Sequence, residues 1–154
     1  MVADEVEYVI GVDTHRDQHT LAVVNAPAGA VVAQAVVAAS ARGYGEALRF
    51  AERYACGVRV WAVEGAGHYG AGLTRYLGER AETVLEVGRH ARGERRLQGK
   101  DDPLEAIRAA RTGLAAETPT LPRAGERQEA LRVLLLARRS AVDFAGPRSC
   151  NCEA

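Results

Sequence analysis

Two carboxylates in this sequence stand directly after apolar, strand-like runs. Asp13 follows the run Tyr8–Val12, and Glu64 follows the run Val58–Val63. A carboxylate in such a place is held stiffly by the sheet, and we expect it to face solvent and offer the oxygen ligands that a hard divalent cation prefers. Either residue alone could simply begin a turn. If the fold brings the two together, their mutual repulsion favours a bound cation, Mg²⁺ or Mn²⁺.

A second acidic pair, Asp102 and Glu105, has two alternative roles. The segment Asp102-Pro103-Leu104-Glu105 suits a helix start, with Asp102 as N-cap, Pro103 in the first turn and Glu105 reaching back to the cap. Residues three apart also share one face of a helix, so the same two carboxylates could complete an acidic metal site. The spacing alone leaves both roles open.

The histidines and cysteines give weaker signals. The spacing of His15, His19 and His68 matches no zinc-binding pattern, so we interpret them as polar loop residues. Cys150 and Cys152 form a single Cys-x-Cys motif with no second half, which argues against a metal site there. A total of three cysteines does not make a disulfide framework.

One segment of the chain is strongly basic although the whole chain is not. The 20 Lys and Arg residues balance the 20 Asp and Glu residues, so any nucleic-acid contact must come from a local patch. Between residues 89 and 100 a single acid is outnumbered by five cations: Arg89, Arg92, Arg95, Arg96 and Lys100. We interpret the segment as an extended basic loop that could neutralise phosphates. A solvated loop without a ligand is the alternative.

The elements that must position these residues can be read from the periodicity of the sequence. Short apolar runs predict strands, and the two short connections between the first three predict an antiparallel meander. Spacings of three and four residues predict helices between the later strands, which makes those strands parallel. The predicted strands are 8–12, 19–25, 31–39, 58–63 and 83–87, and the helices 43–55, 68–80 and 102–115. This is the element order of an RNase H-like α/β domain, in which the first and fourth strands are parallel neighbours.

We predict an acidic metal-site domain over residues 1–117, a linker over 118–125, a helix of a following helical region over 126–142, and an atypical, disordered tail over 143–154. Acidic residues precede the first apolar run, which argues against a signal peptide. No apolar run is long enough to span a bilayer, so we expect a cytoplasmic protein without a membrane segment.

Four blocks of the sequence resemble the DEDD-type insertion-sequence transposases, the insertion-sequence family numbered one hundred and ten. The resemblance covers roughly residues 8–142. Its blocks are Ile10-Gly11-Val12-Asp13-Thr14-His15, Val60-Trp61-Ala62-Val63-Glu64-Gly65, Gly99-Lys100-Asp101-Asp102-Pro103-Leu104-Glu105-Ala106 and, within the last predicted helix, Leu131-Arg132-Val133-Leu134-Leu135.

The resemblance implies a DNA recombinase whose amino-terminal domain is RuvC-like: a mixed five-stranded sheet with flanking helices, extended by a carboxy-terminal helical region. Its four metal-binding acids would correspond to Asp13, Glu64, Asp102 and Glu105. Two divalent ions, Mg²⁺ or Mn²⁺, could then activate the attacking oxygen and stabilise the leaving oxygen of a phosphodiester. The implied partners are DNA and an element-encoded guide RNA, with assembly of the full-length protein into a homo-oligomer.

The sequence departs from the family pattern in two places. Glu105 stands where the family has its last Asp, one methylene shorter. Residues 143–154 do not resemble the family's continuation into a serine-bearing domain, so we expect a truncated chain that is inactive alone. The alternative is a non-catalytic remnant that binds nucleic acid or co-assembles with intact transposase. A sugar-kinase lobe also opens with a Gly-x-Asp strand, but its glycine-rich phosphate loops are missing here.

Overall fold

The computed structural model of the protein describes residues 1–88, 102–118, 120–122, 133–135, 137–138 and 140–141. The chain forms two compact units, Met1–Pro122 and Arg123–Ala154. The first unit contains the sheet and the helices that pack on it. In the second unit, the described residues 133–135, 137–138 and 140–141 are helical, within the helix predicted over 126–142.

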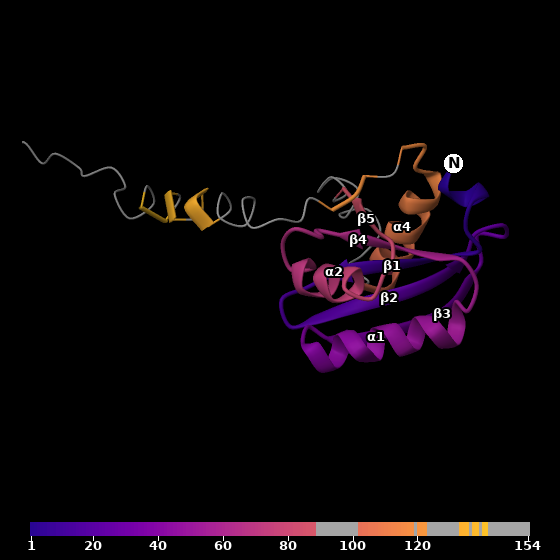
Figure 1. Ribbon diagram of the computed structural model, residues 1–154, viewed down its shortest axis with the longest axis horizontal. Helices are drawn as coiled ribbons and strands as arrows, with labels where there is room; N and C mark the ends of the chain where they lie inside the picture. The colour runs from indigo at the N-terminus through magenta and orange to yellow at the C-terminus, as the bar shows by residue number, and fades with distance from the viewer. Residues whose placement is uncertain (89–101, 119, 123–132, 136, 139, 142–154) are drawn as a thin grey trace, which may run out of the picture. The chain divides into compact units, whose positions relative to one another are not determined.

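The first unit is built on one sheet of five strands (Figure 1). They are β1 (Tyr8–Thr14), β2 (Gln18–Asn25), β3 (Val31–Ala38), β4 (Arg59–Glu64) and β5 (Val84–Val87). The order across the sheet is β3-β2-β1-β4-β5. The pairs β1–β2 and β2–β3 are antiparallel, whereas β1–β4 and β4–β5 are parallel. The predicted meander and the predicted pairing of the first and fourth strands are both confirmed.

Helices cover both faces of the sheet (Figure 1). They are α1 (Ala41–Tyr54), α2 (Ala71–Gly78) and α4 (Asp102–Ala115). Residues of α1 and α2 share one apolar core with Ile10 and Val12 of β1, and residues of α4 share a second core with Val9. Successive side chains of a strand point to opposite faces, so β1 contributes to both cores. Among the described residues, no helix is long and apolar enough to cross a lipid bilayer.

Helix α4 packs on the sheet through small residues. A Cβ atom built at Gly11 of β1 would collide with the carbonyl oxygen of Ala106 and would lie 2.8 Å from the Cβ of Ala110. A Cβ atom built at Gly113 would lie 2.7 Å from the Cβ of Ala62 on β4. Glycine and alanine therefore let the backbone of α4 approach the two central parallel strands closely.

Two local predictions need correction. The helix predicted over 68–80 begins only at Ala71, because Gly65 has a φ of +68° and its carbonyl accepts hydrogen bonds from the amides of His68 and Gly70. That backbone conformation favours glycine and closes a turn before the helix. The first residues also form a short 3₁₀ helix, η1 (Val2–Asp4), which was not predicted. Its Val2 is buried in the α4-side core.

Several predicted segments lie wholly or partly outside the described residues. They are the basic loop from Arg89 to Lys100, most of the last helix, and the tail over 143–154. Within the predicted linker, the carbonyl of Thr120 accepts a hydrogen bond from the Glu86 amide of β5 at 2.7 Å. That part of the linker therefore lies along the outer strand of the sheet.

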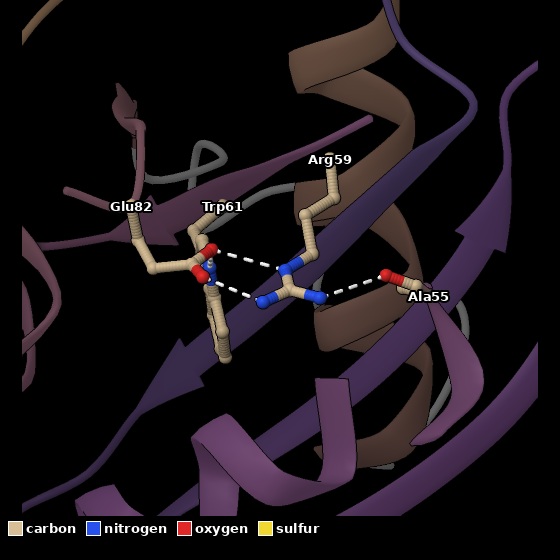
Figure 2. A network of polar contacts seen from close by, with 4 residues as sticks. All are labelled: Ala55, Arg59, Trp61 and Glu82. Carbon is tan, nitrogen blue, oxygen red and sulfur yellow. Dashed lines mark hydrogen bonds and ion pairs between the residues drawn. The ribbon is translucent and has the colours of Figure 1, made fainter. Parts of the chain in front are cut away.

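An ion pair ties β4 to the turn before β5 (Figure 2). The Arg59 guanidinium donates to both carboxylate oxygens of Glu82, at 3.0 and 2.6 Å, and to the carbonyl of Ala55 at 2.9 Å. The indole of Trp61 donates to the same carboxylate at 2.8 Å. Hydrogen bonding to Arg59 lowers the pKa of Glu82 against the opposing effect of burial. The network fixes the two strands at the end remote from Asp13 and Glu64.

Replacing Glu82 with Gln should destabilise the protein in a pH-dependent way. At neutral pH we expect a loss of about 2 kcal/mol in the free energy of unfolding, since a charge-assisted hydrogen bond contributes about that much. Because the pKa of Glu82 is lower in the folded state, its stabilisation is present above the ordinary carboxyl pKa and is lost as the pH falls through the folded value. The loss is measured by urea unfolding at pH 7 and at successively lower pH. If the difference in unfolding free energy between the wild type and Glu82→Gln did not become smaller at low pH, this role of Glu82 would be contradicted.

Replacing Gly11 with Ala should weaken the packing of α4. The new methyl group would meet the backbone of α4, and overpacking of this kind costs about 2–3 kcal/mol. Urea unfolding measures the loss. Gly78→Ala is the matched control, because a Cβ atom there has no neighbour within 4 Å. Equal stability of the two variants would show that α4 can move aside without cost.

Candidate metal centre

The parallel pairing of β1 with β4 brings Asp13 and Glu64 to the same edge of the sheet. The register places Val12 beside Val63, so the next residue of each strand is the predicted metal ligand. Glu64 is the last residue of β4, whereas Asp13 is followed by one further strand residue, Thr14. The two carboxylates thus stand on neighbouring strands at their carboxyl ends, where open α/β sheets usually place their sites.

Both carboxylates belong to the face of the sheet that α4 covers. On β1, Val9 packs in the α4-side core and Gly11 lies against α4. Asp13 is two residues further along the strand, so its side chain points to the same face. On β4, Val60 and Ala62 pack in that core, and Glu64 continues their alternation. The sequence alone did not indicate which face the acids occupy.

The expectation that Asp13 faces solvent is wrong. Only 9% of its side chain is exposed, and Glu64 is 2% exposed. Asp13 lies inside a paired strand, opposite Thr20 of β2, and helix α4 covers its face of the sheet. Two carboxylates this deeply placed need hydrogen bonds, cationic side chains or a bound cation to remain ionised.

Glu105 lies in the first turn of α4, directly before the residue that contacts Gly11. Its Oε1 accepts a hydrogen bond from Arg108 at 3.2 Å, and its side chain is 13% exposed. Its Oε2 is buried and has no hydrogen-bond partner. An unpartnered buried carboxylate oxygen is costly, so this atom is suited to a cation or a donor that approaches from outside the protein.

Asp102 is the first residue of α4, and its side chain lies outside the described residues. The choice between helix cap and metal ligand therefore stays open for Asp102. Cys150, Cys152 and the five basic residues from Arg89 to Lys100 also lie outside them.

Three residues that the sequence did not single out lie beside the acids. The hydroxyl of Thr14 donates to the carbonyl of Glu64 at 2.7 Å and fastens the ends of β1 and β4 together. The buried hydroxyl of Thr20, opposite Asp13, has no hydrogen-bond partner. Arg108 holds Glu105. The predicted antiparallel pairing could have identified Thr20. The short connection after β1 makes β2 run back beside β1, so a residue near the start of β2 must lie opposite Asp13.

One histidine, His19, is not the polar loop residue that was predicted from spacing, whereas His15 and His68 do lie in connections between elements. His19 is fully buried in β2, where its ring stacks on Tyr44 with the centroids 5.9 Å apart. Burial lowers its pKa, although the backbone of Gln18 opposes the shift, and neither ring nitrogen has a partner in hydrogen-bonding geometry. His15, half exposed, has its Nε2 3.5 Å from Asp13 Oδ2. His68 does follow β4 in a turn, and its ring packs edge-on against Tyr69.

The donor chemistry of this edge suits a hard divalent cation. Carboxylate oxygens of Asp13, Glu64 and Glu105 and the hydroxyl of Thr20 come from the same side of the sheet, and oxygen donors are what Mg²⁺ and Mn²⁺ prefer. Within the part of the chain that the structure describes, however, no three His, Cys, Asp or Glu side chains gather closely enough to enclose a metal ion. These residues therefore match a divalent metal in the type of their donor atoms and in the face of the sheet that they share. They do not form a closed set of ligands around a metal position.

Comparison with known proteins identifies the relatives of this chain. The family model of the DEDD transposases of insertion-sequence type 110, described as "Transposase", matches residues 10–147. The match spans the sheet, the acid-bearing helix α4 and the region beyond them. A search of curated proteins found no match.

Proposed function

The chain belongs to the DEDD-type insertion-sequence transposases, and from that premise we propose that Asp13, Glu64, Asp102 and Glu105 form a Mg²⁺-binding site for phosphodiester strand transfer. Membership of the family supports a role in DNA transposition, with DNA as partner and a divalent metal as cofactor. The identity of the metal, the four ligands and the strand-transfer step are our proposal. Mn²⁺ would serve in place of Mg²⁺.

One observation carries this proposal: the parallel register of β1 and β4 sets two buried carboxylates side by side at the sheet edge. Two carboxylates at the same edge of a sheet offer the oxygen donors that a divalent cation prefers. Glu105, on the helix that covers the same face, adds a buried carboxylate oxygen, Oε2, that lacks a partner. A divalent cation at this edge would offset part of the negative charge that the acids bring to this face of the sheet.

Bound divalent ions would activate the attacking oxygen and stabilise the leaving oxygen of the phosphodiester. The residues of the chain position this chemistry. The sheet holds Asp13 and Glu64 rigidly, and the hydrogen bond from Thr14 keeps the two strand ends in register. Arg108 orients Glu105, so a longer side chain than the family's Asp is still held in one place. His15 lies at the exposed rim, within reach of Asp13 and of an approaching phosphate.

The nucleic-acid contacts are assigned to the basic segment. Arg89, Arg92, Arg95, Arg96 and Lys100 immediately precede α4 in the sequence, so they are tethered to the helix that carries Asp102 and Glu105. Five cations between residues 89 and 100 suit a phosphate backbone, in which each neutralised phosphate releases counterions. The guide RNA partner and the homo-oligomeric assembly stay predictions.

Divalent metal should stabilise the protein, and the effect should need Asp13. With free Mn²⁺ at one hundred times its Kd, mass action predicts about 2.7 kcal/mol of added unfolding free energy. Asp13→Asn keeps the shape of the side chain but removes the charge, so we expect most of this stabilisation to disappear. The measurement is urea unfolding followed by circular dichroism, with MnCl₂ and with a chelator.

Asp17→Asn is the matched control for that experiment. Asp17 follows β1 at the same end of the strand, but it is 77% exposed and bonded to Arg16. It should keep the full response to Mn²⁺. If Asp13→Asn responds to Mn²⁺ as the wild type does, the metal site is not at the sheet edge and the proposed function fails.

Removing two charges from the basic segment should reduce the salt dependence of DNA binding. For Arg95→Gln/Arg96→Gln, the slope of log Kd against log salt concentration should fall by about 0.9 for each phosphate that is no longer neutralised. Fluorescence anisotropy of a labelled duplex, titrated at several KCl concentrations, gives the slope. The control is Arg75→Gln, an exposed residue of α2 on the face opposite α4. An equal slope in both variants would argue for a solvated loop instead.

A further inference from the structure

Two turns border the sheet edge that carries Asp13 and Glu64. One, residues 15–17, connects β1 with β2, and the other, residues 65–70, connects β4 with α2. The first turn lies directly beside the acids, since the Nε2 atom of His15 is 3.5 Å from Oδ2 of Asp13. The second turn begins at the residue after Glu64. Side chains of both turns are therefore placed to meet whatever binds at this edge.

The second turn is fixed against the strand ends. A Cβ atom built at Gly70 would lie 2.9 Å from Cγ1 of Val63 and 3.1 Å from Cγ2 of Thr14, so the backbone there packs closely on β4 and β1. The amide of Gly70 also donates to the carbonyl of Gly65 at 3.2 Å and closes the turn. Tyr69 directly precedes this anchored glycine, and its side chain is nevertheless 42% exposed.

The surroundings of Tyr69 are aromatic and cationic. The ring of His68 packs edge-on against it, with the centroids 4.4 Å apart. Hydrogen bonding to Asp17 raises the pKa of Arg16, and the nearby phenol of Tyr69 adds to that shift. An exposed aromatic ring beside an arginine suits a nucleotide, because the ring can stack on a base while the guanidinium neutralises a phosphate.

We propose that Tyr69 stacks on an unpaired base of the DNA strand at the candidate metal centre, and that Arg16 binds a phosphate of the same strand. The proposal rests on the proposed function, which places the strand at this edge. In a duplex both faces of a base are covered by its neighbours, so a ring can stack only on a base that has left the helix. The substrate class is therefore DNA with unpaired nucleotides next to the reacting phosphodiester.

Arg16 is held ready for such a phosphate by an exchangeable partner. Its Nε donates to both carboxylate oxygens of Asp17, at 3.1 and 3.2 Å, and its Nη2 donates to Oδ2 at 3.1 Å. Both side chains are more than three-quarters exposed, and an exposed ion pair contributes little to stability. A phosphate can therefore replace Asp17 at small cost.

The chain contains a matched pair of residues away from the acids. Tyr54, the last residue of α1, is 37% exposed, and the guanidinium of Arg53 lies 5.3 Å from the centre of its ring. The next residue, Ala55, accepts a hydrogen bond from Arg59, which begins β4 at the opposite edge of the sheet. Tyr54 and Arg53 thus have the same chemistry as Tyr69 and Arg16 in a different place.

Replacing Tyr69 with Ala should weaken the binding of single-stranded DNA selectively. We expect Kd to rise about tenfold, because stacking contributes about 1–3 kcal/mol per base. Binding of a duplex of the same sequence should not change. Tyr69→Phe retains the ring and should bind like the wild type, and Tyr54→Ala is the matched control. Fluorescence anisotropy of labelled strands with the whole chain, in a chelator, gives each Kd, and circular dichroism checks the fold.

Replacing Arg16 with Gln should make single-strand binding less sensitive to salt. The slope of log Kd against log KCl concentration should fall by about 0.7, the contribution of one phosphate on a single strand. Arg53→Gln should keep the wild-type slope. An unchanged slope in Arg16→Gln would overturn the phosphate contact.

Three results would overturn the stacking contact: an unchanged single-strand Kd in Tyr69→Ala, an equal loss on single strand and duplex, or an equal loss in Tyr54→Ala. The chelator makes these results independent of the metal. Tyr69→Ala should keep the full stabilisation by Mn²⁺. A normal Mn²⁺ response without any effect of Tyr69 overturns this inference alone. An effect of Tyr69 without any Mn²⁺ response supports the stacking contact and overturns the proposed metal site.

Discussion

The parallel pairing of β1 with β4 is the constraint on which the site depends. Because the two strands run in the same direction and in register, their carboxyl ends coincide, and the alternation of side chains sends Asp13 and Glu64 to the same face. A shift of one residue in that register would turn one acid toward α1 and the other toward α4. The hydrogen bond from Thr14 to the Glu64 carbonyl acts at the point where such a shift would begin.

Helix α4 adds a third acidic residue, Glu105, to the two that the strand pair supplies. Its small-residue face, seated on Gly11 and Ala62, lies on the face of the sheet that carries the two acids, and the start of the helix reaches Gln34 of β3. The same close approach removes Asp13 from water. Burial raises the free energy of a carboxylate, and it equally strengthens the attraction of that carboxylate for a cation because little water screens the charges. Close packing and affinity for metal thus have one structural origin.

The sequence predicted what depends on local pattern. Apolar runs bounded by turn residues located all five strands, and short connections separated the antiparallel pairs from the parallel ones. The burial of Asp13 was not predictable in this way, since it depends on a helix about ninety residues later in the chain. His19 was misjudged for a similar reason: its partner Tyr44 comes from α1, and spacing within the sequence does not reveal a stacked ring.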